Sequence, residues 1–256
     1  MDRSGGQARH SGDLIASVSG RNPARNLHSD VLWALGFAIV SGQYPQGSIL
    51  PPDSDLLEQF DVSRTVLREA LKTLAAKGLI EARARIGTRV LAKERWNLFD
   101  SDVLAWHFEL GPDIAFLRSL AEVRIGIEIE AAALATERAS PEQAAMLNDC
   151  VDKMAASESP GDFARHDLAF HKALAEASGN PFMASISALV EMALTAAFTI
   201  SSPVNDPASL AETVGVHRQI AEAVRDGDAA AARAAMRDAI AQGFARAAGQ
   251  MEKSFP

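Results

Sequence analysis

Residues 50–74 of this 256-residue chain contain two short amphipathic segments separated by a tight turn. Apolar residues recur at helical spacing in both segments: Leu56, Leu57 and Phe60 in the first, and Val66, Leu67, Ala70, Leu71 and Leu74 in the second. Asp53 and Ser63 are suitable N-cap residues for the two segments. Asp61 tolerates the left-handed conformation that a tight turn requires. The pattern predicts two short helices joined by a turn, which is a helix-turn-helix.

The outer face of the second predicted helix is basic. Arg64, Arg68 and Lys72 are each four residues apart, and Thr65 lies beside them. When such a helix enters the major groove of DNA, groups of this kind contact phosphates and base edges. An ordinary helical hairpin with a solvated basic face explains the same residues, because charges at this spacing are common.

A β-hairpin is predicted directly after these helices. Residues 81–91 read as two short strands around a turn near Ile86 and Gly87. Between Ser63 and Arg89 there are seven Lys or Arg residues and two Asp or Glu residues, whereas the whole chain has a net charge of −8. A basic segment in an acidic protein favours a contact with nucleic acid.

The segment from Leu50 to Val90 resembles the winged helix-turn-helix of the GntR family of bacterial transcriptional regulators. The matching pieces are Leu50-Pro51, Val62-Ser63-Arg64, Leu67-Arg68-Glu69-Ala70-Leu71, Leu74, Gly78-Leu79-Ile80 and Gly87-Thr88. In that family the residues matching Arg64, Thr65 and Arg68 contact DNA, and a wing-tip glycine approaches the minor groove. Ser54 stands where some members have a DNA-contacting arginine, so operator preference does not transfer from them. The predicted DNA-binding residues are Ser63, Arg64, Thr65, Arg68, Lys72, Arg85, Gly87 and Thr88.

The chain divides into two predicted domains joined by a linker. Residues 1–25 are rich in Ser, Gly and Arg and lack the apolar stretch of a secretory signal, so we expect a disordered leader there. The winged helix-turn-helix domain is expected at 26–92, the linker at 93–106 and a helical domain at 107–256. No run of about 18 apolar residues occurs, and the chain has a single cysteine. These features predict a cytoplasmic protein without a membrane span.

The second half of the chain is alanine-rich and is predicted to be helical almost throughout. Six candidate helices are separated by breaks, at Pro112–Ser140, Pro141–Glu158, Gly161–Ser178, Pro181–Ser201, Pro207–Gly227 and Ala229–Lys253. Helices with short connections favour an antiparallel bundle. Residues 93–256 hold 14 basic and 24 acidic side chains, which makes this half a poor DNA binder and the candidate sensor. The predicted fold class is therefore mainly α, with an N-terminal winged helix-turn-helix and a C-terminal all-α bundle.

Three polar side chains of the bundle form a candidate metal site. Asp167 and His171 lie four residues apart on one predicted helix and project from the same face, and His217 lies in the middle of a later helix. One carboxylate and two imidazoles are suitable ligands for a divalent cation. Three separate polar groups, each with its own hydrogen bond, explain the same residues.

The bundle resembles the FCD effector domain of FadR-type members of the GntR family. The matching runs are Phe163…Asp167-Leu168-Ala169-Phe170-His171…Ser178-Gly179-Asn180-Pro181 and His217-Arg218-Gln219-Ile220…Gly227-Asp228. In many members the residues matching Asp167, His171 and His217 bind zinc or nickel together with a histidine on the last helix, where this chain has Ala239. The resemblance implies either a weakened divalent-metal site or a metal-free site in which both histidines bind an organic anion.

Arg124 is the remaining candidate for the site. On a surface it would pair with Glu128, four residues later, which is worth only roughly a few tenths of a kcal/mol. Directed into the bundle, its guanidinium could clamp a carboxylate with two parallel hydrogen bonds, and family members use a matching arginine for carboxylate recognition. The predicted effector-binding residues are Arg124, Asp167, His171 and His217, of which the last three are also the predicted metal ligands.

The linker contains two tryptophans and is expected to be docked. Its Trp96-Asn97…Asp100-x-Asp102-Val103-Leu104-x-Trp106 pattern resembles that of the galactonate-operon repressors, a sugar-acid branch of the family. The resemblance implies a repressor of a sugar-acid catabolic operon that is released by a small carboxylic acid, and a helix-turn-helix of this kind usually binds operator DNA as a homodimer. The alternatives are a metalloenzyme that uses Asp167, His171 and His217, and an adaptor that binds only protein. The enzyme alternative leaves the basic segment without a role.

Overall fold

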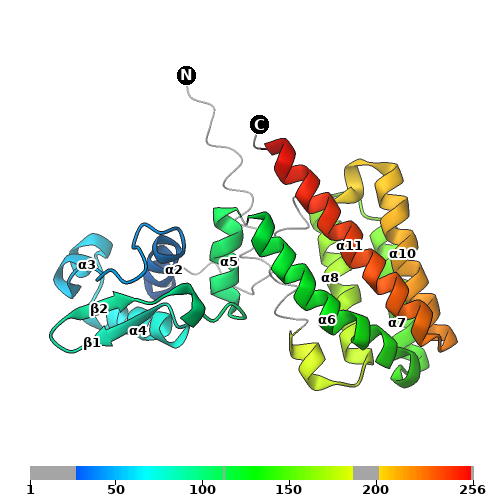
Figure 1. The fold of residues 1–256 in the computed structure, drawn as a ribbon, viewed down its shortest axis with the longest axis horizontal. Coiled ribbons are helices and arrows are strands. Elements are labelled where there is room, and N and C mark those ends of the chain that lie inside the picture. Colours follow the sequence, from blue (N-terminus) through cyan, green and yellow to red (C-terminus); the bar gives the residue numbers. More distant parts are fainter. Residues whose placement is uncertain (1–26, 112, 187–201, 255–256) are drawn as a thin grey trace. The chain divides into compact units, whose positions relative to one another are not determined.

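The computed structural model describes residues 27–111, 113–186 and 202–254. The chain forms two compact units, with the division after Gly111. Helices dominate both units, and the described residues contain one sheet of two antiparallel strands (Figure 1). The predicted fold class, mainly α with a winged helix-turn-helix followed by a helical domain, is confirmed. Among the described helices, none combines the length and the apolar character that a membrane crossing requires.

The first unit contains the predicted helix-turn-helix. Its helices are α2 (Leu27–Val40), α3 (Asp53–Phe60) and α4 (Arg64–Ala76). Asp61 takes the left-handed conformation, with φ 48°, and Ser63 caps α4 by accepting a hydrogen bond from the Val66 backbone N–H at 3.4 Å. The predicted cap at Asp53 is wrong, because Pro52 is at the N-cap position and makes no side-chain hydrogen bond. Asp53 is instead the first residue of α3, where its charge suits the positive end of the helix dipole.

The wing follows α4 as a short hairpin. Its strands are β1 (Ile80–Arg83) and β2 (Gly87–Val90). They pair antiparallel, with Ile80 opposite Val90 and Arg83 opposite Gly87. Arg85 (φ 65°) and Gly87 (φ 112°) adopt positive φ angles at the tip, and glycine is the residue that tolerates such angles best. Ile80 and Val90 are buried, so the base of the hairpin packs on the core while the tip is exposed.

The segment predicted as the linker folds against the first unit. It contains η1 (Lys93–Arg95) and α5 (Ser101–Leu110). The Trp106 side chain is fully buried against Gly36 of α2, where a Cβ atom would overlap the indole ring. Lys77, at the end of α4, forms ion pairs of 2.8 and 2.9 Å with Asp100 and Asp102 at the start of α5. The structural boundary between the units therefore comes later in the chain than the sequence predicted, at the end of α5.

Long helices make up the described part of the second unit (Figure 1). They are α6 (Ile114–Arg138), α7 (Pro141–Ala155), α8 (Pro160–Ala177), α10 (Pro207–Asp226) and α11 (Ala229–Ser254), with the 3-10 helix η2 (Pro203–Asn205) before α10. Ser140, Ser159 and Asp206 cap the helices that follow them. Residues 181–186 are helical, and the rest of the predicted helix Pro181–Ser201 lies outside the described residues.

Small side chains allow the helices of the second unit to pack closely. α11 lies beside both α6 and α10, and α7 lies beside α8. The core combines alanines such as Ala132, Ala135 and Ala232 with larger apolar residues such as Phe170 and Met236. Charged side chains are buried in this unit as well. Because a buried charge is costly unless it is paired, these groups mark the place to look for a binding site.

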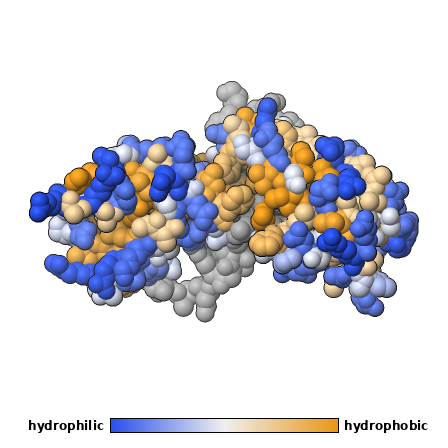
Figure 2. Space-filling model, turned by 60° about the horizontal axis from the view of Figure 1, so that its bottom comes forward, coloured by the Kyte–Doolittle hydropathy of each residue, from blue (hydrophilic) through white to orange (hydrophobic). Residues whose placement is uncertain are grey.

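Apolar side chains are not confined to the two cores. Figure 2 shows them interspersed with hydrophilic side chains over the visible face of each unit. Phe182, at 78%, is the most exposed of the large apolar residues that the structure describes. Single exposed apolar residues are normal in folded proteins, so they do not by themselves identify a site. The charged groups are the more informative guide.

Candidate functional site

α4 presents a basic face to solvent. Its exposed polar residues are Arg64, Thr65, Arg68 and Lys72, and its buried residues are Leu67, Ala70 and Leu74. The side chains of Arg68 and Lys72 are 68% and 63% exposed. Glu69 Oε1 lies 3.0 Å from Lys72 Nζ and 3.7 Å from Arg68 Nε. Exposed ion pairs of this kind are weak, so both cations can exchange Glu69 for a phosphate oxygen.

The wing tip carries the remaining predicted DNA-binding residues. Arg85 and Gly87 are exposed at the turn, and Thr88 follows in β2 with partial burial. The Ser63 hydroxyl is engaged as the cap of α4. The structure therefore places all eight predicted residues on α4, its cap or the wing, within one unit.

Lys77, a lysine of the basic segment, takes part in the packing of the first unit and is not exposed for contact with DNA. The Lys77 side chain is 10% exposed and is held between Asp100 and Asp102. Burial by itself would lower the pKa of Lys77, but the hydrogen bonds and charges of the two aspartates raise it above its ordinary value. The exposed charge of the segment is therefore smaller than its residue count predicts.

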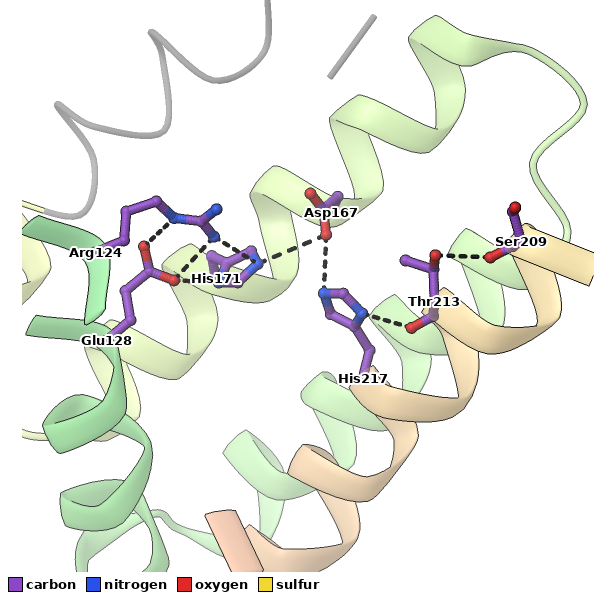
Figure 3. Close-up of polar contacts among 7 residues, drawn as sticks. All are labelled: Arg124, Glu128, Asp167, His171, Ser209, Thr213 and His217. Atoms are coloured by element: carbon purple, nitrogen blue, oxygen red, sulfur yellow. Dashed lines mark hydrogen bonds and ion pairs between the residues drawn. The ribbon is translucent and has the colours of Figure 1, made fainter. Parts of the chain in front are cut away.

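A buried polar cluster lies in the second unit, centred on Asp167 (Figure 3). Asp167 Oδ1 is 3.0 Å from His217 Nε2 and 3.6 Å from His171 Nε2. Asp167 and His171 come from α8, and His217 comes from α10. All three side chains are at most 4% exposed. The structure thus brings together the three residues that the sequence placed on two separate helices.

The other nitrogen of each imidazole has its own partner. His217 Nδ1 is 2.8 Å from the Thr213 carbonyl oxygen, and His171 Nδ1 is 2.9 Å from Glu128 Oε2. Because a carbonyl oxygen can only accept, His217 carries a proton on Nδ1. This leaves Nε2, which faces Asp167 Oδ1 at 3.0 Å, as the ring nitrogen of His217 that a bound cation would use.

Charge is balanced around His171. Burial opposes its ionisation, but the charge of Glu128, with the contacts to Asp167 and Glu128, raises the pKa of His171 to about 10. Burial opposes ionisation of Glu128 as well, yet Arg124 and His171 lower its pKa to about 2. Burial would raise the pKa of Asp167, but the hydrogen bonds and charges of His171 and His217 hold it well below its usual range. Without a metal, the cluster contains two cations, Arg124 and His171, and two carboxylates.

Three residues of the cluster carry atom types that bind divalent cations. One ligand atom each from Asp167, His171 and His217 lies within 4.8 Å of the other two, and all three residues are buried. Metal-binding histidines usually donate the second ring N–H to a carboxylate or a carbonyl, which Glu128 and the Thr213 carbonyl provide here. Ala239 lines the same pocket and offers no ligand atom. The chain therefore supplies three protein ligands.

Arg124 contributes to the pocket from α6. Its Nε lies 2.6 Å from Glu128 Oε1 and its Nη2 lies 3.1 Å from Glu128 Oε2. The pair with Glu128 considered from the sequence is therefore present, but it is buried, with both side chains 5% exposed. Arg124 also lines the pocket. The Glu128 carboxylate therefore holds its guanidinium at the pocket wall.

Arg246, which is not among the residues predicted from the sequence, lines the same pocket from α11. Its Nε is buried and has no hydrogen-bond partner among the described residues. Burial lowers the pKa of Arg246, and the negative charge of Asp167 opposes that shift. The available signal was helical spacing, because Arg246 follows Ala239 by seven residues and so lies on the same helix face.

Comparison with known proteins agrees with the division of the chain into a DNA-binding unit and a helical unit. Residues 27–90 match the family described as bacterial regulatory proteins, gntR family, and residues 119–242 match the FCD domain. YieP of Escherichia coli K12, an uncharacterized helix-turn-helix transcriptional regulator, is 36% identical over 213 residues, which cover 80% of this chain and 90% of that protein. The chain belongs to the GntR family.

This GntR regulator is also similar to proteins named for particular operons. The galactonate operon transcriptional repressor of Escherichia coli K12 is 32% identical over 203 residues, covering 78% of this chain and 88% of the repressor. The Uxu operon transcriptional regulator of the same strain is 33% identical and covers 77% of each chain. The solved structure of Lar from Listeria monocytogenes shares the fold, with a TM-score of 0.65 and 18% identity over 89% of this chain and 99% of that one.

The two matched domains contain the two candidate sites. The gntR match includes α4 and the wing, and the FCD match includes Arg124, Asp167, His171 and His217. This GntR protein is therefore a DNA-binding transcriptional regulator, and the families and relatives that it matches are regulators, not enzymes, so the comparisons do not support the metalloenzyme interpretation. Arg246 lies beyond the last residue of the FCD match.

Proposed function

We propose that this regulator represses a sugar-acid catabolic operon and leaves its operator when a small carboxylic acid binds in the pocket of the helical unit. The observation that carries the proposal is the buried cluster of cations and hydrogen-bonding groups around Asp167, in a different unit from the basic face of α4. Similarity to the galactonate operon repressor supports sugar acids as the effector class.

The pocket chemistry suits a sugar acid, which offers one carboxylate and several hydroxyls. Arg124 and Arg246 supply guanidinium groups at the pocket wall, and guanidinium binds carboxylate well. Asp167 and His217 can form hydrogen bonds with hydroxyls. The cavity itself has a volume of about 10 Å³, so side chains of its wall must move apart to admit a sugar acid.

Any divalent cation in this pocket would be held by Asp167, His171 and His217. The proposed DNA partner is a pseudo-palindromic operator bound by a homodimer, because a helix-turn-helix usually reads DNA with two-fold symmetry. The effector can release DNA only by favouring a dimer arrangement that misplaces the two α4 helices.

A sugar acid is expected to raise the thermal unfolding temperature of the protein and to lower its operator affinity. A ligand that binds only the native state at about 100 times its Kd stabilises that state by about 2.7 kcal/mol. Thermal unfolding and gel shift across aldonates, uronates and fatty acids measure the two effects. The alditol of matching length is the control, because it lacks only the carboxylate. If no acid changes either measurement, the sensor assignment is wrong.

Arg68→Ala is expected to weaken operator binding by about 1–3 kcal/mol, because Arg68 projects from the exposed face of α4 and an arginine can bind a base edge bidentately. Lys72→Ala should give a smaller loss on all sequences and a shallower salt dependence. Gel-shift titrations on operator and random DNA at two salt concentrations measure both.

The matched control for these variants is Arg165→Ala, which removes an equally exposed arginine from α8 in the other unit. Circular dichroism checks that each variant is folded. Operator affinity equal to that of the Arg165 control in a folded Arg68→Ala protein would remove Arg68 from the DNA interface.

A further inference from the structure

One face of α11 forms a wall of the effector pocket. Ala239, Gly243 and Arg246 are spaced by four and three residues, and all three line the pocket. The first two have almost no side chain, so they leave space beside the ligand atoms of Asp167 and His217. Arg246 is the charged side chain that α11 directs toward this space.

Arg246 has an unusual setting for an arginine. Its Nε is buried without a hydrogen-bond partner among the described residues, although a guanidinium normally satisfies its donors when it is removed from water. Asp167 is the first carboxylate whose charge acts on it, followed by Glu212. The guanidinium is therefore positioned to compensate charge on the same carboxylate that a metal would require.

We propose that Arg246 is a built-in cation that keeps divalent metals from binding tightly to Asp167, His171 and His217, so that the pocket binds its effector without a metal. The consequence for the effector rests on the proposed function, whereas the exclusion of metal does not.

The physical basis is repulsion between like charges in a poorly solvated site. A divalent ion at Asp167 would lie in the same small pocket as the Arg246 guanidinium, and charges are weakly screened there. Arg124 adds a second positive charge, but Glu128 neutralises it through two hydrogen bonds. Ala239 explains the loss of one ligand atom, and Arg246 adds an electrostatic penalty for the remaining three.

Arg246→Met is expected to raise the affinity for zinc or nickel by roughly tenfold or more, measured by calorimetry with the metal alone on protein stripped with EDTA. Arg246→Lys keeps the charge and should remain as weak as the wild type. Ala239→His should gain less affinity alone than in combination with Arg246→Met. Arg237→Met is the matched control, because it removes an exposed charge from the same helix.

The proposal is overturned if Arg246→Met and Arg237→Met bind metal equally, or if Arg246→Lys gains as much affinity as Arg246→Met. Circular dichroism of the metal-free proteins checks folding, and Arg246→Gln replaces the Met variant if the latter does not fold.

A second measurement compares the sugar-acid response of wild-type protein with and without EDTA. Equal responses support the proposal, and a response that requires added zinc contradicts it. If no acid acts under either condition, the proposed function fails while the metal titration still tests Arg246.

Discussion

Arg124→Ala is expected to lower the free energy of unfolding of the helical unit by about 3–5 kcal/mol. The substitution leaves Glu128 buried at 5% exposure without the guanidinium that holds both of its oxygens. All three tryptophans, Trp33, Trp96 and Trp106, lie in the first unit. In a urea titration, the far-UV circular dichroism transition should therefore move while the tryptophan fluorescence transition should not.

A double variant separates loss of the ion pair from loss of effector binding. Arg124→Gln/Glu128→Gln removes both charges together and should recover much of the stability, since the main cost is removing one charge from the balanced cluster of Arg124, Glu128, His171 and Asp167. If this protein is folded but shows no heat stabilisation by a sugar acid that stabilises the wild type, the pair contributes to recognition. Stability of Arg124→Ala within about 0.5 kcal/mol of the wild type would contradict the buried pair.

Trp106→Ala is expected to cost the first unit about 3–5 kcal/mol, because it removes a fully buried aromatic side chain and leaves a cavity beside Gly36. Operator affinity should fall with the fraction of folded protein, since α5 packs on α2 and α2 packs on α4. Tryptophan fluorescence from the two remaining residues follows unfolding in urea, and gel shift follows DNA binding.

Phe99→Ala is the matched control, because Phe99 lies in the same segment but is 46% exposed. It should change stability by less than about 0.5 kcal/mol. Trp106→Phe should cost less than Trp106→Ala, because it keeps most of the packing and removes an indole N–H that has no partner among the described residues. Equal stability of Trp106→Ala and Phe99→Ala would show that α5 is a detached linker.

The sequence determined the elements whose signals are local. Apolar spacing predicted α3 and α4, and residue type predicted the Ser63 cap of α4 and the left-handed conformation of Asp61. Proline, serine and glycine breaks located the helices of the second unit. Spacing of four residues placed Asp167 and His171 on one face of α8. These features depend on neighbours within one or two turns, which is the range that periodicity and capping describe.

The tertiary structure decided what depends on contacts between distant segments. The Arg124–Glu128 pair is buried because α6 packs against α8. Its sequence spacing alone predicted a weak surface pair, whereas in the structure it joins the charge network with His171. Lys77 belongs to the basic segment by sequence, yet two aspartates of α5 neutralise it. Arg246 entered the pocket only because α11 lies against α6 and α10. Burial sets the energy of a charge, and burial is a property of the assembled helices that no local pattern encodes.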